Sequence, residues 1–260
     1  MSLNSVQLGT PEWQADVESS PPVRKIKSRT THTHRHAPWL INRNRLAYVE
    51  SRNELIGVLA LEYLEMRGLL SFYKEQPFTT PPELWEIAIA NLTDRKSHEY
   101  TPDFYARSPQ GDKFVIEVKS ARFVSREMEA SLERWKEIFA EYGLKYLLWT
   151  DRTPLVGCLR QNLLRLRRAA VQYFEEDEVS RLVDILDTKG PRPVWALYNQ
   201  DIDLDLIAYA TWLGKTHFPL ENALCGTTEI SIEPSSTLAQ HLLGIQPDMH
   251  RWWNNLEAAA

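Results

Sequence analysis

The sequence YTPDFYA, residues 100–106, is followed by a polar turn at residues 108–112 and then by KFVIEVKS, residues 113–120. Aromatic and β-branched residues predominate on both sides of this turn, which contains a proline and a glycine. Short β-prone runs separated by such a turn predict two antiparallel strands. The stretch is therefore expected to form a β-hairpin.

Charged side chains are expected to gather on one side of this hairpin. Because side chains alternate along a strand, Val115, Glu117 and Lys119 share one face, and the apolar residues between them share the other. The hairpin can bring Asp103, near the end of the first strand, to the side of Glu117 and Lys119. Two carboxylates and an ammonium group then converge at one point.

Such a group of side chains has a chemistry of its own. Carboxylate oxygens are ligands that suit Mg²⁺. A lysine beside the metal can position a water molecule or help to remove its proton. These groups fit metal-assisted hydrolysis of a phosphodiester, because the cation stabilises developing charge and lowers the pKa of bound water. The alternative is an amphipathic hairpin whose charges are simply solvated.

The whole chain has the composition of a soluble globular protein, with 260 residues and a formal net charge of −5. This length allows one large domain or two smaller ones. A net negative charge argues against a chain that coats nucleic acid on its own. Two cysteines, Cys158 and Cys225, do not have the spacing of a metal site. Without a membrane-spanning run or a signal peptide pattern, a cytoplasmic location is expected.

The N-terminal residues change character along the chain. Residues 1–21 are polar without a clear period and are expected to be mobile. Residues 22–45 contain no acid and form the strongest basic cluster. This arm is expected either to bind DNA phosphates or to be a solvated leader. Its candidate DNA-binding residues are Arg24, Lys25, Lys27, Arg29, Arg35, Arg43 and Arg45.

The first helix is predicted over residues 51–66, which are apolar around most of the helix circumference and should be buried. Glu54 lies within it, and an unpaired buried carboxylate is costly. Ser51 followed by Glu54 fits a capping box, in which the two residues satisfy each other's backbone donors. Glu54 also fits a helix-borne metal ligand that faces the hairpin, so both roles stay open.

The segments after the hairpin predict further elements. Residues 125–142 have apolar side chains on one helical face, and residues 145–151 form a buried strand. The order strand, helix, strand predicts a parallel crossover beside the hairpin. Residues 79–98 indicate a turn followed by either a short strand or a helix.

The C-terminal part is predicted to be mainly helical. Helices are expected over residues 155–174, 175–186 and within 194–219, followed by a β-prone stretch at 227–232. This layout is compatible with a winged-helix module. The last residues contain one further possible helix and the pair Trp252-Trp253, which could anchor a partner or pack on the core.

Four motifs occur in an order that resembles a known family. They are the Ser-x-x-Glu of residues 51–54, the Glu-Gln-Pro of 75–77, the Thr-Pro-Asp-Phe of 101–104 and the Glu-Val-Lys of 117–119. Together they resemble the N-terminal nuclease domain of TnsA, the endonuclease subunit of heteromeric bacterial transposases. That domain is a member of the PD-(D/E)xK nuclease superfamily.

The resemblance implies an α/β fold with a restriction-endonuclease-like core, in which helices flank a mixed β-sheet. A smaller, mainly helical and winged-helix-like domain is expected to follow this core. The expected division is an arm at 1–45, the nuclease domain at 46–153, the winged-helix-like domain at 154–234 and a tail at 235–260.

The resemblance also implies a reaction and a set of residues. Glu54, Asp103 and Glu117 would hold Mg²⁺, for which Mn²⁺ would substitute, and Lys119 would act as the base or as an electrostatic stabiliser. Gln76 would lie near the site. The enzyme would cut the 5′ ends of a transposon in double-stranded DNA, while a TnsB-like DDE transposase subunit cuts the 3′ ends and a TnsC-like AAA+ ATPase contacts the C-terminal domain. The alternatives are a standalone restriction or repair nuclease and a non-catalytic assembly factor.

Overall fold

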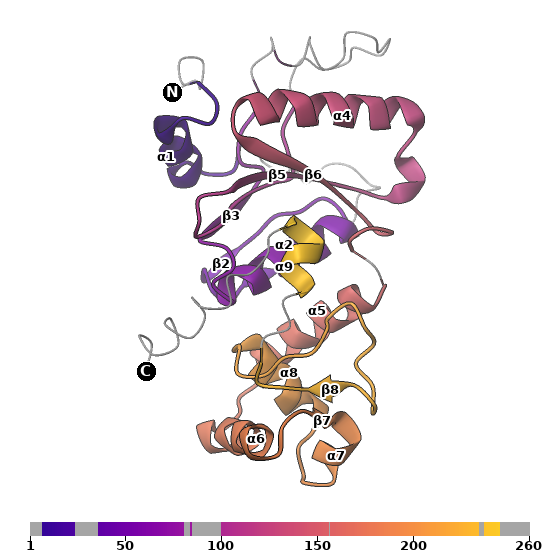
Figure 1. Cartoon of the computed structure of the whole chain (residues 1–260). Helices are drawn as coiled ribbons and strands as arrows, with labels where there is room; N and C mark the ends of the chain where they lie inside the picture. The colour runs from indigo at the N-terminus through magenta and orange to yellow at the C-terminus, as the bar shows by residue number, and fades with distance from the viewer. Residues whose placement is uncertain are drawn as a thin grey trace.

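The computed structural model describes residues 7–23, 36–80, 84, 100–155, 157–233 and 237–244. It has two parts, which lie one below the other in Figure 1. The upper part is a β-sheet with helices on both faces, and the lower part is a group of short helices with a small β-ribbon. We call them the nuclease-like part and the C-terminal unit.

The central sheet has four strands in the order β3-β4-β5-β6. The pairs β3/β4 and β4/β5 are antiparallel, and β5/β6 is parallel. The predicted hairpin is therefore confirmed as β4 and β5. The predicted parallel crossover is confirmed as well, with helix α4 between β5 and β6. The bounds are Phe72–Glu75 (β3), Phe104–Arg107 (β4), Lys113–Lys119 (β5), Arg126–Glu141 (α4) and Leu144–Thr150 (β6).

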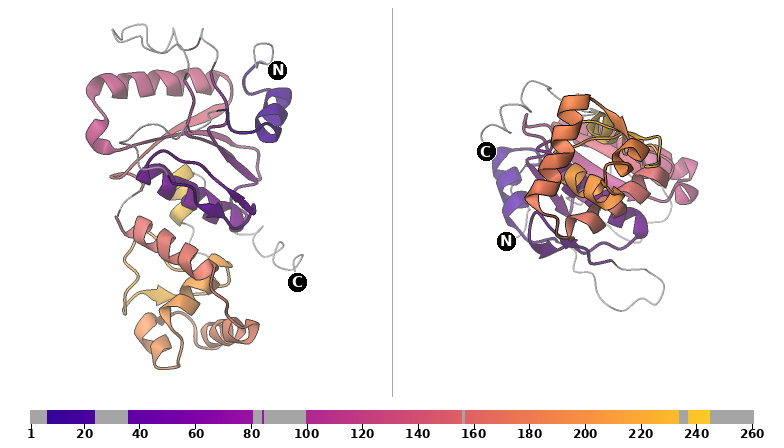
Figure 2. Two further views of the ribbon diagram at one scale, coloured as in Figure 1. Left: turned by 180° about the vertical axis from the view of Figure 1, so that it is seen from behind. Right: turned by 90° about the horizontal axis from the view of Figure 1, so that it is seen from below.

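The predicted alternation of side chains along β5 is confirmed by the two hydrophobic clusters of the sheet. Phe114, Ile116 and Val118 lie in the cluster on the face covered by helix α2. Val115 lies in the cluster on the opposite face, which α4 covers. Figure 1 and the left view of Figure 2 show the sheet between these two helices. The mixed, helix-flanked sheet agrees with the expected nuclease-like core.

Helix α1, Pro11–Ser19, corrects the expectation that residues 1–21 lack regular structure. Thr10 caps the helix, and its Trp13 and Val17 are buried against the α4 face of the sheet. The ammonium group of Lys74 donates hydrogen bonds to the backbone carbonyl groups of Val17 and Ser20. Two apolar side chains are too few to give a visible period, so only tertiary packing reveals this helix.

Helix α2, Arg52–Met66, is the predicted first helix, and its burial is confirmed. Ten of its 15 residues are buried, which requires contacts on more than one side. One side packs on the sheet, and another packs on helix α5 of the C-terminal unit. This arrangement explains why apolar residues surround most of the helix.

The C-terminal unit is mainly helical, as predicted. Its short strands β7 and β8 pair antiparallel, and His217 forms a further bridge to Ser231 on the end of β8. Its elements are α5 (Gly157–Ala170), α6 (Glu176–Lys189), β7 (Arg192–Pro193), α7 (Val194–Tyr198), α8 (Leu204–Trp212) and β8 (Glu229–Ile230).

The chain then returns to the nuclease-like part. Helix α9, Thr237–Leu243, packs near α2 and the end of the sheet, where Nε1 of Trp149 donates a hydrogen bond of 3.0 Å to the carbonyl oxygen of Leu242. The further helix expected in the tail is thus present. The pair Trp252-Trp253 and the segment 85–98, whose structure the sequence left open, lie outside the described residues.

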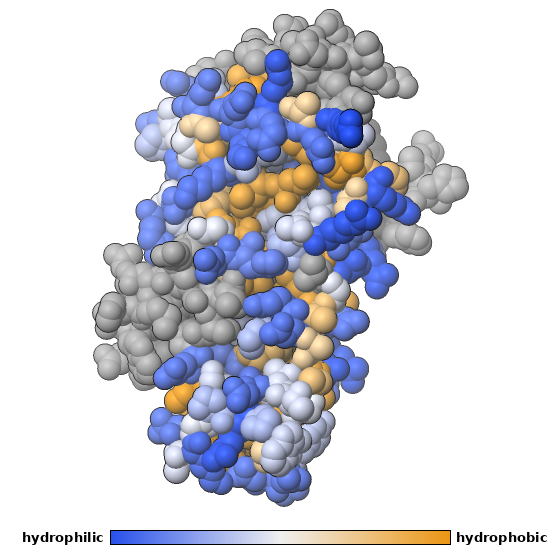
Figure 3. Space-filling model, turned by 45° about the vertical axis from the view of Figure 1, so that its right-hand side comes forward, coloured by the Kyte–Doolittle hydropathy of each residue, from blue (hydrophilic) through white to orange (hydrophobic). Residues whose placement is uncertain are grey.

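The surface of the molecule is mostly polar. On the face shown in Figure 3, apolar side chains form a band across the nuclease-like part, between hydrophilic residues on either side. Among the described residues, no helix combines the length and the apolar character that crossing a membrane requires. A small two-stranded ribbon, β1 (Trp39–Leu40) and β2 (Arg45–Leu46), precedes α2.

A buried polar contact joins α2 to the C-terminal unit. Nη2 of Arg67, at the end of α2, lies 2.9 Å from the ring nitrogens of His217. Because a guanidinium group can only donate, the nitrogen of His217 that faces it must be unprotonated. Gly214 approaches the same guanidinium, and a Cβ atom there would lie 2.6 Å from Nη1 of Arg67. Burial, together with the charge of Arg67, lowers the pKa of His217 to about 3.

This contact makes the stability of the protein sensitive to acid. The folded-state pKa of His217 lies below its unfolded value, so its contribution is complete above about pH 6.5 and declines below that pH. The loss should approach about 1.4 kcal/mol per pH unit. Urea unfolding of the wild type and of His217→Gln at about pH 7 and pH 5 tests this, since glutamine does not titrate. We expect a smaller loss in the variant, and equal losses would contradict the assignment.

Candidate active site

Asp103 immediately precedes β4 and lies across from the carboxyl end of β5. Its Oδ2 accepts a hydrogen bond of 2.7 Å from the backbone N–H of Val118. Its backbone carbonyl accepts one of 2.8 Å from the N–H of Gln76, directly after β3. Backbone bonds on both sides thus fix the position of Asp103. The prediction that the hairpin brings this carboxylate toward Glu117 and Lys119 is met by the geometry.

Glu117 and Lys119 project from the same face of β5, toward its carboxyl end. The ammonium group of Lys119 forms an ion pair with Oε1 of Glu117. Lys119 leaves 36% of its side-chain surface exposed and Glu117 only 5%, so the lysine is the group that a bound molecule meets first. The pair is therefore accessible from the lysine side.

Tyr100 holds the other oxygen of Glu117 and is itself bonded to Tyr146. The hydroxyl group of Tyr100 donates a hydrogen bond of 2.6 Å to Oε2 of Glu117, and it lies 2.9 Å from the hydroxyl group of Tyr146. The ring of Tyr100 stacks on Trp135 of α4, with ring centroids 4.6 Å apart. Burial, reinforced by the nearby carboxylate of Glu117, raises the pKa of Tyr100 well above its usual value. Tyr100 is thus a neutral donor that orients Glu117.

Glu54 lies in the first turn of α2 and serves as part of the helix cap. Ser51 Oγ accepts a hydrogen bond of 3.1 Å from the N–H of Glu54, and Oε2 of Glu54 accepts one of 2.8 Å from the N–H of Glu50. The capping interpretation therefore has direct support, with Glu50 in place of the Ser51 donor of a standard capping box. The same carboxylate is close enough to influence Asp103 and Lys119 electrostatically.

The charges of these four residues are coupled. Burial, and next the charge of Glu117, raises the pKa of Asp103 well above its usual range. Burial also raises the pKa of Glu54. For Lys119, burial alone would lower the pKa, but the carboxylates of Glu117 and Asp103 outweigh it and raise the value. Negative charge is thus concentrated at this end of the sheet, with Lys119 as the neighbouring cation.

The donor set has the chemistry of a magnesium site, because it consists of carboxylate oxygens that disfavour one another's charge. A cation would relieve this repulsion. Within the part of the chain that the structure describes, however, no three acidic, histidine or cysteine side chains converge closely enough to form a ready-made metal site. Instead, Glu117 is paired with Lys119 and Glu54 with a backbone N–H.

Gln76 lies beside the site, in the position expected from the Glu-Gln-Pro motif. It is buried and adopts a left-handed backbone conformation with φ of 43°, which is uncommon for a residue other than glycine. Its N–H bonds to Asp103, and its carbonyl accepts a hydrogen bond of 3.0 Å from the N–H of Val23. Gln76 therefore links the N-terminal segment to the strand end that carries Asp103.

The basic arm is only partly described. Arg43 and Arg45 do not point freely toward a ligand, since they form ion pairs with Glu65 and Glu75. Nη2 of Arg45 lies 2.6 Å from Oε2 of Glu75, which is 2% exposed. Their charges thus balance internal glutamates, which weighs against the prediction that Arg43 and Arg45 contact DNA. The other five candidates, Arg24, Lys25, Lys27, Arg29 and Arg35, lie outside the described residues.

Three residues of the site were not predicted from the sequence. Tyr100 donates to Glu117, and Tyr146 bonds to Tyr100. Asp151 accepts hydrogen bonds from Ser120 Oγ, at 3.0 Å, and from the N–H of Ala121, at 2.8 Å. Tyr100 lies three residues before Asp103, and Asp151 directly follows β6, the strand parallel to β5. The sequence feature that could have identified them is their position near the ends of the predicted strands, close to Asp103 and to the Glu-Val-Lys motif.

The concentration of buried carboxylates should limit stability. An asparagine at position 103 can still accept the hydrogen bond from the N–H of Val118. It removes the negative charge, which burial and the nearby Glu117 carboxylate make unfavourable. We expect Asp103→Asn to raise the free energy of unfolding by about 1 kcal/mol, as substitutions at strained functional sites can do. Thermal or urea unfolding measures the change. Asp112→Asn is the matched control, since Asp112 is 38% exposed and pairs with Lys145. A loss of stability in Asp103→Asn alone would contradict the prediction.

The comparisons with known proteins agree with the motif order. The family model of the TnsA-like endonuclease N-terminal domain matches residues 71–151. This range contains β3 to β6 with Asp103, Glu117 and Lys119, whereas Glu54 on α2 precedes it. A search of curated proteins gives no match. Residues 71–151 are therefore similar to the N-terminal domain of TnsA-like endonucleases, in agreement with the resemblance that the motifs carry.

Proposed function

We propose that the protein is a Mg²⁺-dependent DNA endonuclease that cuts the 5′ ends of a transposon within a transposition complex. The observation that carries the proposal is the meeting of Asp103, Glu117 and Lys119 with Glu54 at the carboxyl end of β5. Asp103, Glu117 and Lys119 lie within the residues that match the endonuclease domain. A non-catalytic assembly factor gives no reason to keep three mutually repelling carboxylates together.

The proposed roles follow from the surroundings of each residue. Asp103, Glu117 and Glu54 would hold Mg²⁺, with Mn²⁺ as a substitute. When bound, the metal supplies charge stabilisation and a more acidic water molecule. Lys119 has a raised pKa, which favours an ammonium group that orients a water molecule and stabilises negative charge on the phosphate. Tyr100 keeps Glu117 in one orientation throughout.

The C-terminal unit is proposed to be a winged-helix module. Its order of helix α6, strand β7, helices α7 and α8, the His217 bridge and strand β8 supports this assignment. The strand β8 lies between β7 and the segment at His217, because it pairs with both.

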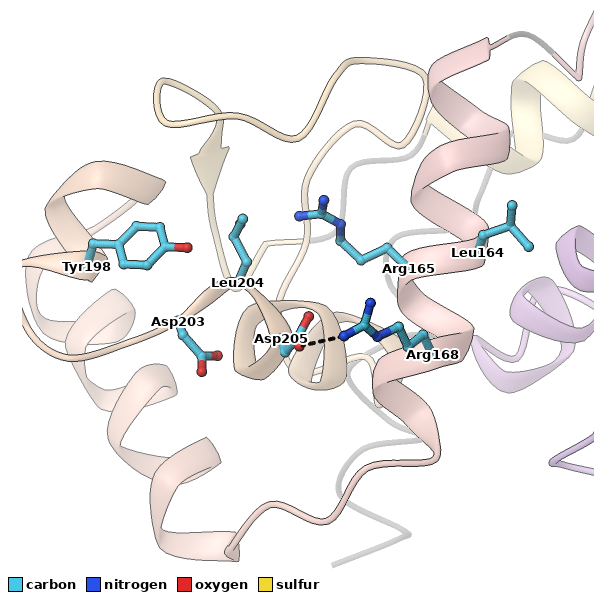
Figure 4. A pocket seen from close by; sticks show the side chains of 7 residues that line it. All are labelled: Leu164, Arg165, Arg168, Tyr198, Asp203, Leu204 and Asp205. Atoms are coloured by element: carbon cyan, nitrogen blue, oxygen red, sulfur yellow. Dashed lines mark ion pairs between the residues drawn. The ribbon is translucent and has the colours of Figure 1, made fainter.

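This module is proposed to bind protein, namely the TnsC-like ATPase, rather than DNA. Helix α8, which would occupy the position of a DNA-recognition helix, is largely buried and has Asp203 and Asp205 at its start. A groove of about 500 Å³ between α5, α7 and α8 combines arginines with these two aspartates and Tyr198, as Figure 4 shows. Mixed charges and exposed aromatic groups favour a protein partner.

The catalytic assignment is tested by strand-specific cleavage of transposon-end DNA in Mg²⁺, with and without the TnsB-like subunit. We expect Asp103→Ala and Glu117→Ala to lose cleavage by about 100-fold or more, since each removes a group that stabilises the reacting phosphate. Asp112→Ala on the same hairpin is the control and should cut normally. Normal cutting by either site variant refutes the site. Cutting by the wild type without the partner would favour a standalone nuclease.

The two roles of Glu54 can be separated by two substitutions. Glu54→Gln keeps an oxygen that accepts from Glu50, so its stability should stay close to that of the wild type, whereas Glu54→Ala should lose about 1 kcal/mol as other lost caps do. If Glu54 also belongs to the catalytic site, both variants lose cleavage. A folded Glu54→Gln protein with full activity would leave Glu54 as a cap only. Unfolding curves and the cleavage assay together decide between these outcomes.

A further inference from the structure

The three elements that surround the site are tied together at one edge of the sheet. Asp151, at the end of β6, accepts hydrogen bonds from Ser120 Oγ and from the N–H of Ala121, in the turn after β5. Nδ2 of Asn53, in the first turn of α2, donates a hydrogen bond of 3.4 Å to the carbonyl oxygen of Lys119 and also contacts Asp151. The start of α2 and the ends of β5 and β6 are therefore neighbours.

Arginines occupy the positions next to these tied residues. Arg52 precedes Asn53, Arg122 follows Ala121 and Arg152 follows Asp151, while Arg126 begins α4 just after the turn. We call these four residues the arginine rim. All four are exposed, and none forms an ion pair with another described residue. The nearby carboxylate of Asp151 is already engaged by the turn.

An exposed aromatic side chain completes this edge. Phe123 belongs to the short helical turn Ala121–Phe123 and is 61% exposed, the largest value among the large apolar side chains described in the nuclease-like part. The guanidinium carbon of Arg122 lies 4.4 Å from the centre of its ring. Exposing a phenylalanine is unfavourable by itself. An arginine and an aromatic ring held together at the surface are suited to a phosphate and a base or sugar.

We propose that the arginine rim and Phe123 form the surface that binds the DNA backbone on either side of the scissile phosphate. This inference rests on the proposed nuclease function and names where the substrate lies. The chain has a net charge of −5, so a phosphate-binding surface must be local. The rim provides four exposed arginines near Lys119, for which the described residues include no ion-pair partner. Arg43 and Arg45 cannot supply this charge, since Glu65 and Glu75 neutralise them.

The groove of the C-terminal unit is the competing surface. Arg165 and Arg168 line it from α5, and Figure 4 shows that they face the end of α8 that carries Asp205. Arg168 lies 4.0 Å from Asp205, and Asp203 lines the same groove. Two carboxylates thus offset the two arginines, which makes this groove less favourable for a polyanion than the rim.

The test measures binding of a fluorescein-labelled duplex oligonucleotide in EDTA, by fluorescence anisotropy over a range of salt concentrations. The double variant Arg122→Ala/Arg152→Ala should bind about 10-fold or more weakly, and its slope of log affinity against log salt should fall by about 2, one for each lost phosphate contact. Arg165→Ala/Arg168→Ala removes the same charge far from the site and should bind as the wild type does. Mg²⁺-dependent cleavage is measured in parallel.

The outcomes separate this inference from the proposed function. If the wild type cuts DNA and the rim variant binds and cuts equally well, the rim is wrong and the nuclease function stands. If the rim variant binds poorly while neither protein cuts even with the TnsB-like subunit present, the rim stands and the proposed function fails. Loss of affinity in the α5 control instead of the rim variant overturns the inference, as does a rim variant that loses only binding to a protein partner.

Phe123 has a separate readout, because an aromatic contact does not release counterions. Phe123→Ala should weaken duplex binding by about 5-fold or more and leave the salt slope unchanged. Tyr173→Ala is the control, since Tyr173 is 83% exposed but lies in the C-terminal unit. An affinity for Phe123→Ala equal to that of the wild type removes Phe123 from the surface.

Discussion

The burial of α2 on two sides is the constraint on which the rest of the structure depends. A helix that is apolar around most of its circumference cannot be stable on the surface, so it needs a sheet on one side and helices on another. The nuclease-like sheet covers the first side, and α5 of the C-terminal unit covers the second. The two parts therefore share one continuous hydrophobic cluster, in which Val118 of the sheet and Leu163 of α5 are both members.

The same helix connects the site with the C-terminal unit. Glu54 in its first turn contributes to the charge cluster around Asp103, and Arg67 at its end contacts His217. With a rise of about 1.5 Å per residue, these two points lie roughly 20 Å apart along a rigid rod. A displacement of the C-terminal unit that moves α2 also moves Glu54. Helix α2 is thus the element that the site and the C-terminal unit have in common.

The sequence predicted those features that depend on local patterns. Alternation along residues 113–119 and the turn before them were enough for the hairpin and for the convergence of Asp103, Glu117 and Lys119. Helix α1 was missed, because its two buried side chains acquire meaning only against the sheet. The ion pairs of Arg43 and Arg45 were missed for a related reason: their partners Glu65 and Glu75 lie 22 and 30 residues away, and only the fold brings them together. Tyr100 depended in the same way on its long-range contact with Glu117.

The buried carboxylates of this protein have two different kinds of surroundings. Glu65 and Glu75 are each held by an arginine through both oxygens, the arrangement that neutralises a partly buried charge. The carboxylates of Asp103 and Glu54 each accept a hydrogen bond from one backbone N–H instead. They lie near each other and near Glu117, and Lys119 is the adjacent cation. The repulsion between these carboxylates does not stabilise the fold, because apolar side chains would fill the same space more favourably. Under the proposed function, the benefit comes from the reaction, which needs concentrated negative charge beside an ammonium group.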